Sequence, residues 1–181
     1  MYKRQVLNDL THDGGLTAIR IEGPTNSVDQ RANRLSKELG LLDQELSILD
    51  SEQSNIFWSR TKNLEVFKSL KSNLLRIVLP MSETLQVIQK LKNFEIKYFI
   101  DWGGGLIWAS FDQLNTKILS EIKDTVKKHQ GYITLIKVEE DLKASADIFT
   151  IDPIKYKISE KIKRSFDPKR IFNPGKMYTG I

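Results

Sequence analysis

The sequence predicts an α+β fold, a mainly antiparallel sheet with helices on one face. Strand-like and helix-like stretches alternate along the chain, and most changes between them fall at a capping or turn residue. Between residues 74 and 138 the predicted elements follow the order βαββαβ, a ferredoxin-like half, and at least one further βαβ unit precedes it. Helices on one face leave the other face open to a ligand or another domain.

The additional βαβ unit is predicted to begin at residue 16. Alternation over residues 16–22 indicates a strand, and the following helix begins at Ser27, which forms a capping box with Gln30. Gly40 is expected to end this helix, because glycine adopts the left-handed conformation at little cost. A weaker strand over residues 45–49 completes the unit.

Capping residues mark the later helices. Asp50 with Gln53 caps a helix that follows the first unit. Asp112 caps the helix before the last strand, and this helix ends at Gly131. A final helix begins at Asp152 and Pro153. The other elements of the βαββαβ half are predicted at residues 74–79, 82–92, 96–101, 106–111 and 132–138.

Three regions divide the 181 residues. Residues 1–15 form no complete element, and we expect them to be either the interior of a longer chain or a frayed terminus. Residues 16–152 form the main domain, and residues 153–181 form a C-terminal helix with an ordered tail. A chain of this length can bury a single substantial core.

The composition excludes several classes of site. The chain has no cysteine and two histidines, so disulfides, thiolate or iron–sulfur sites and a multi-histidine metal cluster are excluded. No apolar run approaches the ~18 residues needed to cross a bilayer, and no signal-like apolar core follows the basic start. We therefore expect a cytoplasmic protein without a membrane span.

The net charge of +5 is concentrated in one segment. Between residues 155 and 176, eight basic residues stand against two acidic ones, whereas the remaining chain is close to neutral. The excess of positive charge therefore belongs to one element and not to a broad binding face. Nucleic acid is therefore not an expected partner.

Three consecutive glycines, Gly103 to Gly105, lie between Trp102 and the strand that contains Trp108. Such a run suits positive φ angles or the close approach of a flat group to the main chain. It is not a nucleotide fingerprint, because it leads into a strand and not into a helix. Two interpretations stay open: a plain hairpin with a bulge, or a loop that faces a planar ligand or a neighbouring domain.

Arg76 lies in the middle of an otherwise apolar strand. Period-two alternation places it on the face opposite Leu75 and Ile77. A guanidinium group in a half-buried strand needs an anionic partner, and its fork suits a substrate carboxylate. The alternatives are a salt bridge with an acidic residue of the chain or a side chain that extends into solvent.

The chain ends in two predicted turns after a helix with apolar residues at four-residue spacing. Asp167 and Pro168 stop the helix, and residues 173–176 fit a type II turn with glycine at the third position. We expect this tail to be ordered. The apolar positions of the helix are Ile154, Ile158, Ile162 and Phe166.

Residues 164–178, RSFDPKRIFNPGKMY, resemble the C-terminal signature of FAD-linked oxidases of the vanillyl-alcohol-oxidase type. The segments 74–80 (LLRIVLP) and 101–108 (DWGGGLIW), with the stretch 15–40, are most similar to the FAD-binding subunit of bacterial glycolate oxidase. The resemblance covers nearly the whole chain from about residue 15.

In this family an N-terminal FAD domain supplies most cofactor contacts, and a C-terminal cap covers the flavin. The resemblance implies that residues 16–152 are the cap or substrate domain, that residues 153–181 include a flavin-proximal tail, and that the N-terminal FAD domain is missing here. It further implies an FAD-dependent oxidoreductase that acts on glycolate or another small 2-hydroxy acid. Other glycolate oxidase subunits would be its partners, and the chain alone would be inactive. Peripheral association with the inner membrane through these subunits stays open.

The resemblance also assigns roles to residues. Arg76 would be catalytic and pair with a substrate carboxylate or a cofactor anion. The histidine-rich metal motif of related D-2-hydroxy-acid enzymes is absent, so no metal site is expected. The cofactor contacts would come from Asn173, Pro174, Gly175 and Lys176, and the substrate cleft would include Trp102, Gly103, Gly104 and Trp108.

Two other functions compete with this one. The first is a ferredoxin-like interaction or RNA-binding module, for which aromatic side chains on the two central strands would be diagnostic. Tyr98 and Phe99 are adjacent in the sequence and therefore face opposite sides of the sheet. The second is a scaffold subunit without chemistry of its own.

Overall fold

The structure, a computed structural model, describes residues 2–8, 16–39, 46–68, 73–139, 142, 149 and 152–175. The fold is α+β, as the sequence predicts. The chain divides into two compact units, Met1–Lys68 and Ser69–Ile181, and each is described by itself. The division falls inside the range 16–152, for which a single domain was predicted.

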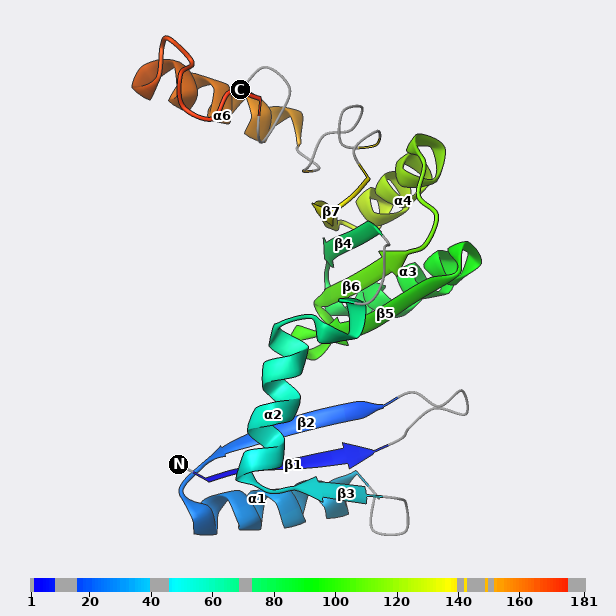
Figure 1. Cartoon of the computed structure of the whole chain (residues 1–181), viewed down its shortest axis with the longest axis vertical. Coiled ribbons are helices and arrows are strands. Elements are labelled where there is room, and N and C mark those ends of the chain that lie inside the picture. Colours follow the sequence, from blue (N-terminus) through cyan, green and yellow to red (C-terminus); the bar gives the residue numbers. More distant parts are fainter. Residues whose placement is uncertain are drawn as a thin grey trace. The chain divides into compact units, whose positions relative to one another are not determined.

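A three-stranded antiparallel sheet forms the first unit (Figure 1). Its middle strand is β1 (Tyr2–Asn8), which pairs with β2 (Thr17–Gly23) on one side and β3 (Leu46–Leu49) on the other. The sequence pattern predicted no complete element in residues 1–15, the segment that contains β1. The four positions from Tyr2 to Gln5 show no run of apolar alternation, so the hydrophobic period gives no strand signal.

Helix α1 (Thr25–Glu38) packs Val28 and Ala32 against Ile21 of the sheet. It begins two residues before the predicted start at Ser27, and its N-cap, Pro24, makes no side-chain capping bond, so the predicted capping box with Gln30 is wrong. Pro24 has extended backbone, and its fixed φ already sets the direction of the chain into the helix. Gly40, the predicted stop, lies outside the described residues.

Helix α2 (Ser51–Lys62) has the predicted capping box. The Gln53 amide donates to Asp50 Oδ1 at 2.8 Å, and the Asp50 amide donates to Gln53 Oε1 at 3.2 Å. These reciprocal bonds satisfy two backbone donors at the start of the helix. A short 3₁₀ turn, η2 (Glu65–Phe67), follows it.

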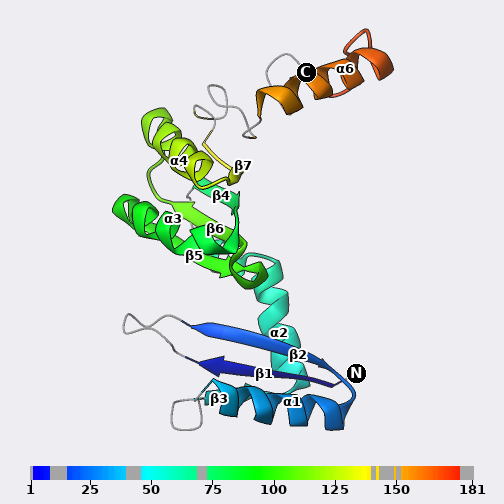
Figure 2. The same cartoon turned by 180° about the vertical axis from the view of Figure 1, so that it is seen from behind.

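The second unit contains the predicted ferredoxin-like half. Its antiparallel sheet has the order β5-β6-β4-β7, and helices α3 and α4 cover one face of it (Figures 1 and 2). Leu75 and Ile77 of β4, Ile107 of β6 and Ile122 of α4 are fully buried in its core. The elements are β4 (Asn73–Val78), η3 (Met81–Glu83), α3 (Thr84–Leu91), η4 (Lys92–Phe94), β5 (Ile96–Asp101), η5 (Trp102–Gly104), β6 (Leu106–Phe111), α4 (Thr116–Lys128) and β7 (Tyr132–Lys137).

Both predicted ends of α4 need correction. Asn115, not Asp112, is the N-cap, and its Oδ1 accepts from the Ile118 amide at 2.9 Å. The chain reverses after the helix at Gln130, which has a φ of 58°. Gly131 does not take a positive φ; a Cβ there would lie 2.7 Å from Val126 Cγ1, so the small residue is needed for space.

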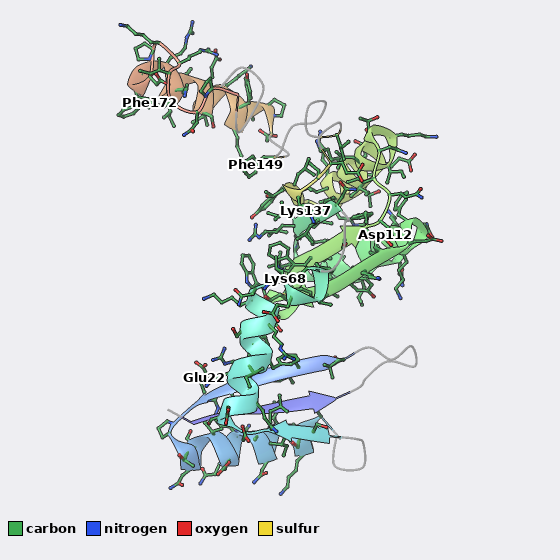
Figure 3. The ribbon with its side chains drawn as sticks, viewed as in Figure 1. Glu22, Lys68, Asp112, Lys137, Phe149 and Phe172 are labelled. Carbon is green, nitrogen blue, oxygen red and sulfur yellow. The ribbon has the colours of Figure 1, made fainter. Side chains whose placement is uncertain are left out.

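Helix α6 (Pro153–Phe166) begins as predicted, with Asp152 Oδ1 accepting from the amides of Ile154 and Lys155. No residue of α6 is buried. The segment after it folds back beside the helix, where Figure 3 labels Phe172. The predicted stop at Asp167 is correct, because this residue is the C-cap.

Candidate functional site

The face of the second sheet that turns away from α3 and α4 carries Arg76. Register places Arg76 between Trp108 of β6 and Thr134 of β7. Phe99 of β5 is opposite Trp108, and their ring centroids are 6.5 Å apart in a tilted arrangement. All four side chains are partly buried. The open face therefore combines one guanidinium group with a pair of aromatic rings.

Arg76 also contacts Trp102 in the turn between β5 and β6. The guanidinium carbon lies 4.9 Å from the centroid of the Trp102 ring, a cation–π contact. Trp102 is 58% exposed, so the contact lies at the rim of the face. Among the described residues, no carboxylate forms an ion pair with Arg76. An aromatic face, and not an acidic residue, is the partner that the structure gives to this charge.

The glycine run forms a tight turn at which positive φ is required. Gly103 and Gly104 have φ angles of 60° and 110°, and Trp102 itself has a φ of 55°. The Trp102 amide donates to Asp101 Oδ1 at 2.7 Å, and the Gly105 amide donates to the Trp102 carbonyl at 3.2 Å. The turn connects two paired strands, so it is a hairpin, and the same hairpin carries the ring that stacks on Arg76.

The glycine run is contacted by Met81 of η3 and by Thr84, the first residue of α3. Sequence reasoning identified neither residue. The Thr84 hydroxyl donates to the Gly104 carbonyl. Met81 lies against the same turn: Cβ atoms added at Gly103 and Gly104 would be 3.9 Å from its Sδ and 3.5 Å from its Cβ. Thr84 is separated by 20 residues from Gly104, so no local motif could reveal this contact.

A polar cluster joins η3, which contains Glu83, to His129 at the end of α4. His129 Nδ1 lies 2.7 Å from Glu83 Oε2, and Lys90 Nζ lies 3.2 Å from His129 Nε2. The hydrogen bond with His129 lowers the pKa of Glu83. With Lys90 donating to Nε2, the neutral tautomer with the proton on Nδ1 satisfies both contacts. The cluster fixes Glu83, the residue immediately before Thr84.

The tail after α6 is organised by Asp167, which is 5% exposed. Its carboxylate pairs with Lys163 Nζ at 2.8 Å and accepts from the amides of Ile171 and Phe172, each at 3.0 Å. Burial raises the pKa of Asp167, but the hydrogen bonds from Lys163 and the two amides outweigh it and lower the pKa to about 2. The tail is therefore held by a charged, fully hydrogen-bonded carboxylate.

The candidate cofactor residues lie in this tail. Asn173 and Gly175 have φ angles of 46° and 67°, and Pro174 lies between them. Gly175 has the positive φ predicted for the third turn position, whereas Lys176 lies outside the described residues. No described hydrogen bond, ion pair or ring contact joins residues 173–175 to Arg76 or Trp102. The structure thus brings together Arg76, Trp102 and Trp108, but not the tail residues with them.

The described residues do not form a dinucleotide site. The glycine turn leads into β6 and opens no helix, and the amides of Trp102 and Gly105 are already used inside it. Within the described ranges, no three His, Asp or Glu side chains are placed to hold a metal ion, and no helix is long and apolar enough to cross a membrane. The face can bind an anion at Arg76 and pack a flat group against aromatic rings.

The comparisons with known proteins give one distant relationship. No protein-family model matches the chain. Over 166 residues, it is 26% identical to glycolate oxidase subunit GlcE of Escherichia coli (strain K12). The match covers 90% of this chain and 39% of GlcE, so the chain spans about two fifths of that relative. The chain is therefore distantly similar to a subunit of an oxidoreductase, glycolate oxidase.

Proposed function

We propose that this chain is the cap domain of a flavin-dependent oxidoreductase that oxidises glycolate or another small 2-hydroxy acid within a multi-subunit glycolate oxidase. The similarity to GlcE and the resemblance of the tail and of residues 74–111 support the enzyme class. One observation of the structure carries the site. Arg76 lies on the open face, in cation–π contact with Trp102, with no carboxylate partner among the described residues.

Stacking and anion binding use different parts of the guanidinium group. The ring of Trp102 approaches the guanidinium carbon, whereas the N–H donors lie at the edge of the planar group. A carboxylate can accept two parallel hydrogen bonds from this edge. In the proposed function, Arg76 holds the substrate carboxylate, and Trp102, Gly103, Gly104 and Trp108 line the substrate side.

The flavin belongs to another domain in this proposal. The described residues make no phosphate cradle, so we assign the FAD to an N-terminal FAD domain of the kind that the resemblance implies and derive no step through it. Residues 173–176 are proposed to approach that cofactor from the tail. The role of this chain is to orient the substrate anion and to exclude water from the covered site. Other glycolate oxidase subunits are the proposed partners.

The test is Arg76→Ala in the enzyme assembled with its flavin domain. Loss of a charged hydrogen-bonded pair of about 1.5–3 kcal/mol should lower kcat/KM about 10- to 150-fold. Lys97→Ala is the matched control, because register places this exposed cation on the same face, away from Trp102. Gel filtration shows whether each variant still assembles. Unchanged turnover of an assembled Arg76→Ala enzyme would favour the scaffold alternative.

One observation also bears on the RNA-binding alternative. Trp108 and Phe99 form an aromatic pair on the open face, as a stacking platform would require. However, β4, the other central strand, presents Arg76 at the corresponding position. Salt-dependent binding of single-stranded RNA at physiological ionic strength, abolished by Trp108→Ala, would support this alternative.

A further inference from the structure

The turn that carries Trp102 is hydrogen-bonded to the first residue of α3. Thr84, the first residue of α3, donates its hydroxyl to the Gly104 carbonyl and is 3% exposed. Its neighbour Glu83 is fixed by His129 from the end of α4. Thr84 is therefore attached to the packed helices and reaches the glycine turn with a single hydrogen bond.

The glycine turn needs such an anchor. Gly103 and Gly104 can adopt many backbone conformations, and the left-handed φ of Trp102 is unfavourable for a residue with a side chain. Strained backbone persists where surrounding contacts determine it. Asp101 and Gly105 hold the turn from within, whereas Thr84 and Met81 connect it to another element.

The position of this turn decides where the ring of Trp102 lies. The contact between Trp102 and Arg76 crosses from the turn to β4, and it brings the guanidinium carbon to 4.9 Å from the centroid of the ring. If the turn moves, Arg76 loses its stacking partner and gains rotamer freedom, which a bound carboxylate must then remove. A residue that fixes the position of the turn therefore also affects how the N–H edge of Arg76 is presented to an anion.

We propose that Thr84 is a positioning residue of the Arg76 site: its hydrogen bond to Gly104 places the Trp102 ring over Arg76 and so orients the guanidinium edge toward a substrate carboxylate. This inference rests on the proposed function for its substrate. The side chain acts through Gly104 and Trp102 and does not itself contact the carboxylate.

The experiment compares Thr84→Val, which removes the hydroxyl at nearly constant shape, with Thr84→Ser, which keeps it. The full chain is labelled with ¹⁵N, and the indole N–H resonance of Trp102 is assigned through Trp102→Phe. Glycolate is then titrated into each protein. Thr84→Val should shift and broaden the Trp102 resonance and weaken glycolate binding about 3- to 10-fold. Thr84→Ser should remain close to the parent chain in both readouts.

A second variant covers the case in which Thr84→Val does not fold. Met81 is 65% exposed, so Met81→Ala should fold and move the Trp102 resonance in the same direction by a smaller amount. If the Trp102 resonance and glycolate affinity are unchanged in Thr84→Val, the positioning role is wrong. If instead the parent chain and Arg76→Ala respond identically to glycolate, the proposed substrate site fails, while the Trp102 resonance still decides whether Thr84 positions the ring.

Discussion

Arg76 shows how a partly buried charge can be accommodated without an anion. An unpaired buried charge costs several kcal/mol, whereas a cation–π contact contributes about 0.5–1 kcal/mol at an exposed site and about 2 kcal/mol when desolvated. The ring of Trp102 therefore offsets part of the cost, and partial exposure to water offsets more. In the proposed function, the substrate carboxylate supplies the anionic partner that completes the interaction.

Gly104→Ala tests the strained turn at the residue scale. A Cβ at a φ of 110° is strained and would lie 3.5 Å from Met81 Cβ, so the free energy of unfolding should fall by about 1–2 kcal/mol. The measurement is urea unfolding followed by tryptophan fluorescence. Gly175→Ala is the matched control. Gly175 also has a positive φ, 67°, but it lies in the tail after α6 and no atom lies within 4 Å of the added Cβ, so the unfolding free energy of the sheet should not change. Equal stability of Gly104→Ala and the parent chain would contradict the requirement for glycine.

The residues of the site differ in how far the sequence could reveal them. Arg76 was identifiable because a charge interrupts an apolar strand, and the glycines because of their run. The stacking on Trp102, the bond from Thr84 and the contact between Glu83 and His129 join residues that are 20 to 46 positions apart. Such contacts depend on the packing of whole elements, and no local spacing encodes them.

At the scale of elements, local signals succeeded where the cap is a side chain that bonds to its own helix. Asp50 and Asp152 cap the helices that the sequence assigned to them. Asp112 failed because two further residues separate it from Asn115, which is the N-cap of α4. Strand β1 had no apolar alternation, and it exists through pairing on both edges with β2 and β3. Pairing between remote strands is the part that a single window of sequence does not contain.

The tail after α6 gives a prediction for pH. Asp167 has a pKa of about 2 in the folded tail and 3.8 ordinarily, so the unfolded tail binds its proton first. The stability that its contacts contribute is complete above pH 3.8 and is lost as the pH falls through about 2. We expect the amide protons of Ile171 and Phe172 to stay protected from exchange at pH 4 and to lose protection toward pH 2.

Asp167→Asn is the control for this titration. The amide cannot pair with the charge of Lys163, so protection at Ile171 and Phe172 should be weaker at neutral pH and should not change between pH 3.8 and 2. Loss of protection in the parent chain already at pH 5 would show that another group, and not Asp167, holds the tail.

At the scale of the whole molecule, the two units have separate cores, and α6 has none. The first core is built around Ile21, Val28 and Ala32, and the second lies between the four-stranded sheet and its two helices. Each residue of the apolar stripe on α6 is more than half exposed; these residues are Ile154 at 69%, Ile158 at 53%, Ile162 at 55% and Phe166 at 83%. A stripe of this kind normally packs against another surface.

In the proposed function the flavin-holding domain is a partner of this chain, and we propose that the stripe on α6 packs against that domain. We propose to replace the matched part of E. coli GlcE by this chain and to measure flavin retained after gel filtration. Ile158→Asp with Ile162→Asp should reduce retained flavin at least tenfold, because burying two carboxylates in an apolar contact costs several kcal/mol. Arg164→Asp is the control, since helical geometry places it on the side opposite the stripe. The chain alone should show no flavin absorbance. Equal flavin retention in the stripe variant and the Arg164 variant would mean that α6 does not form this contact.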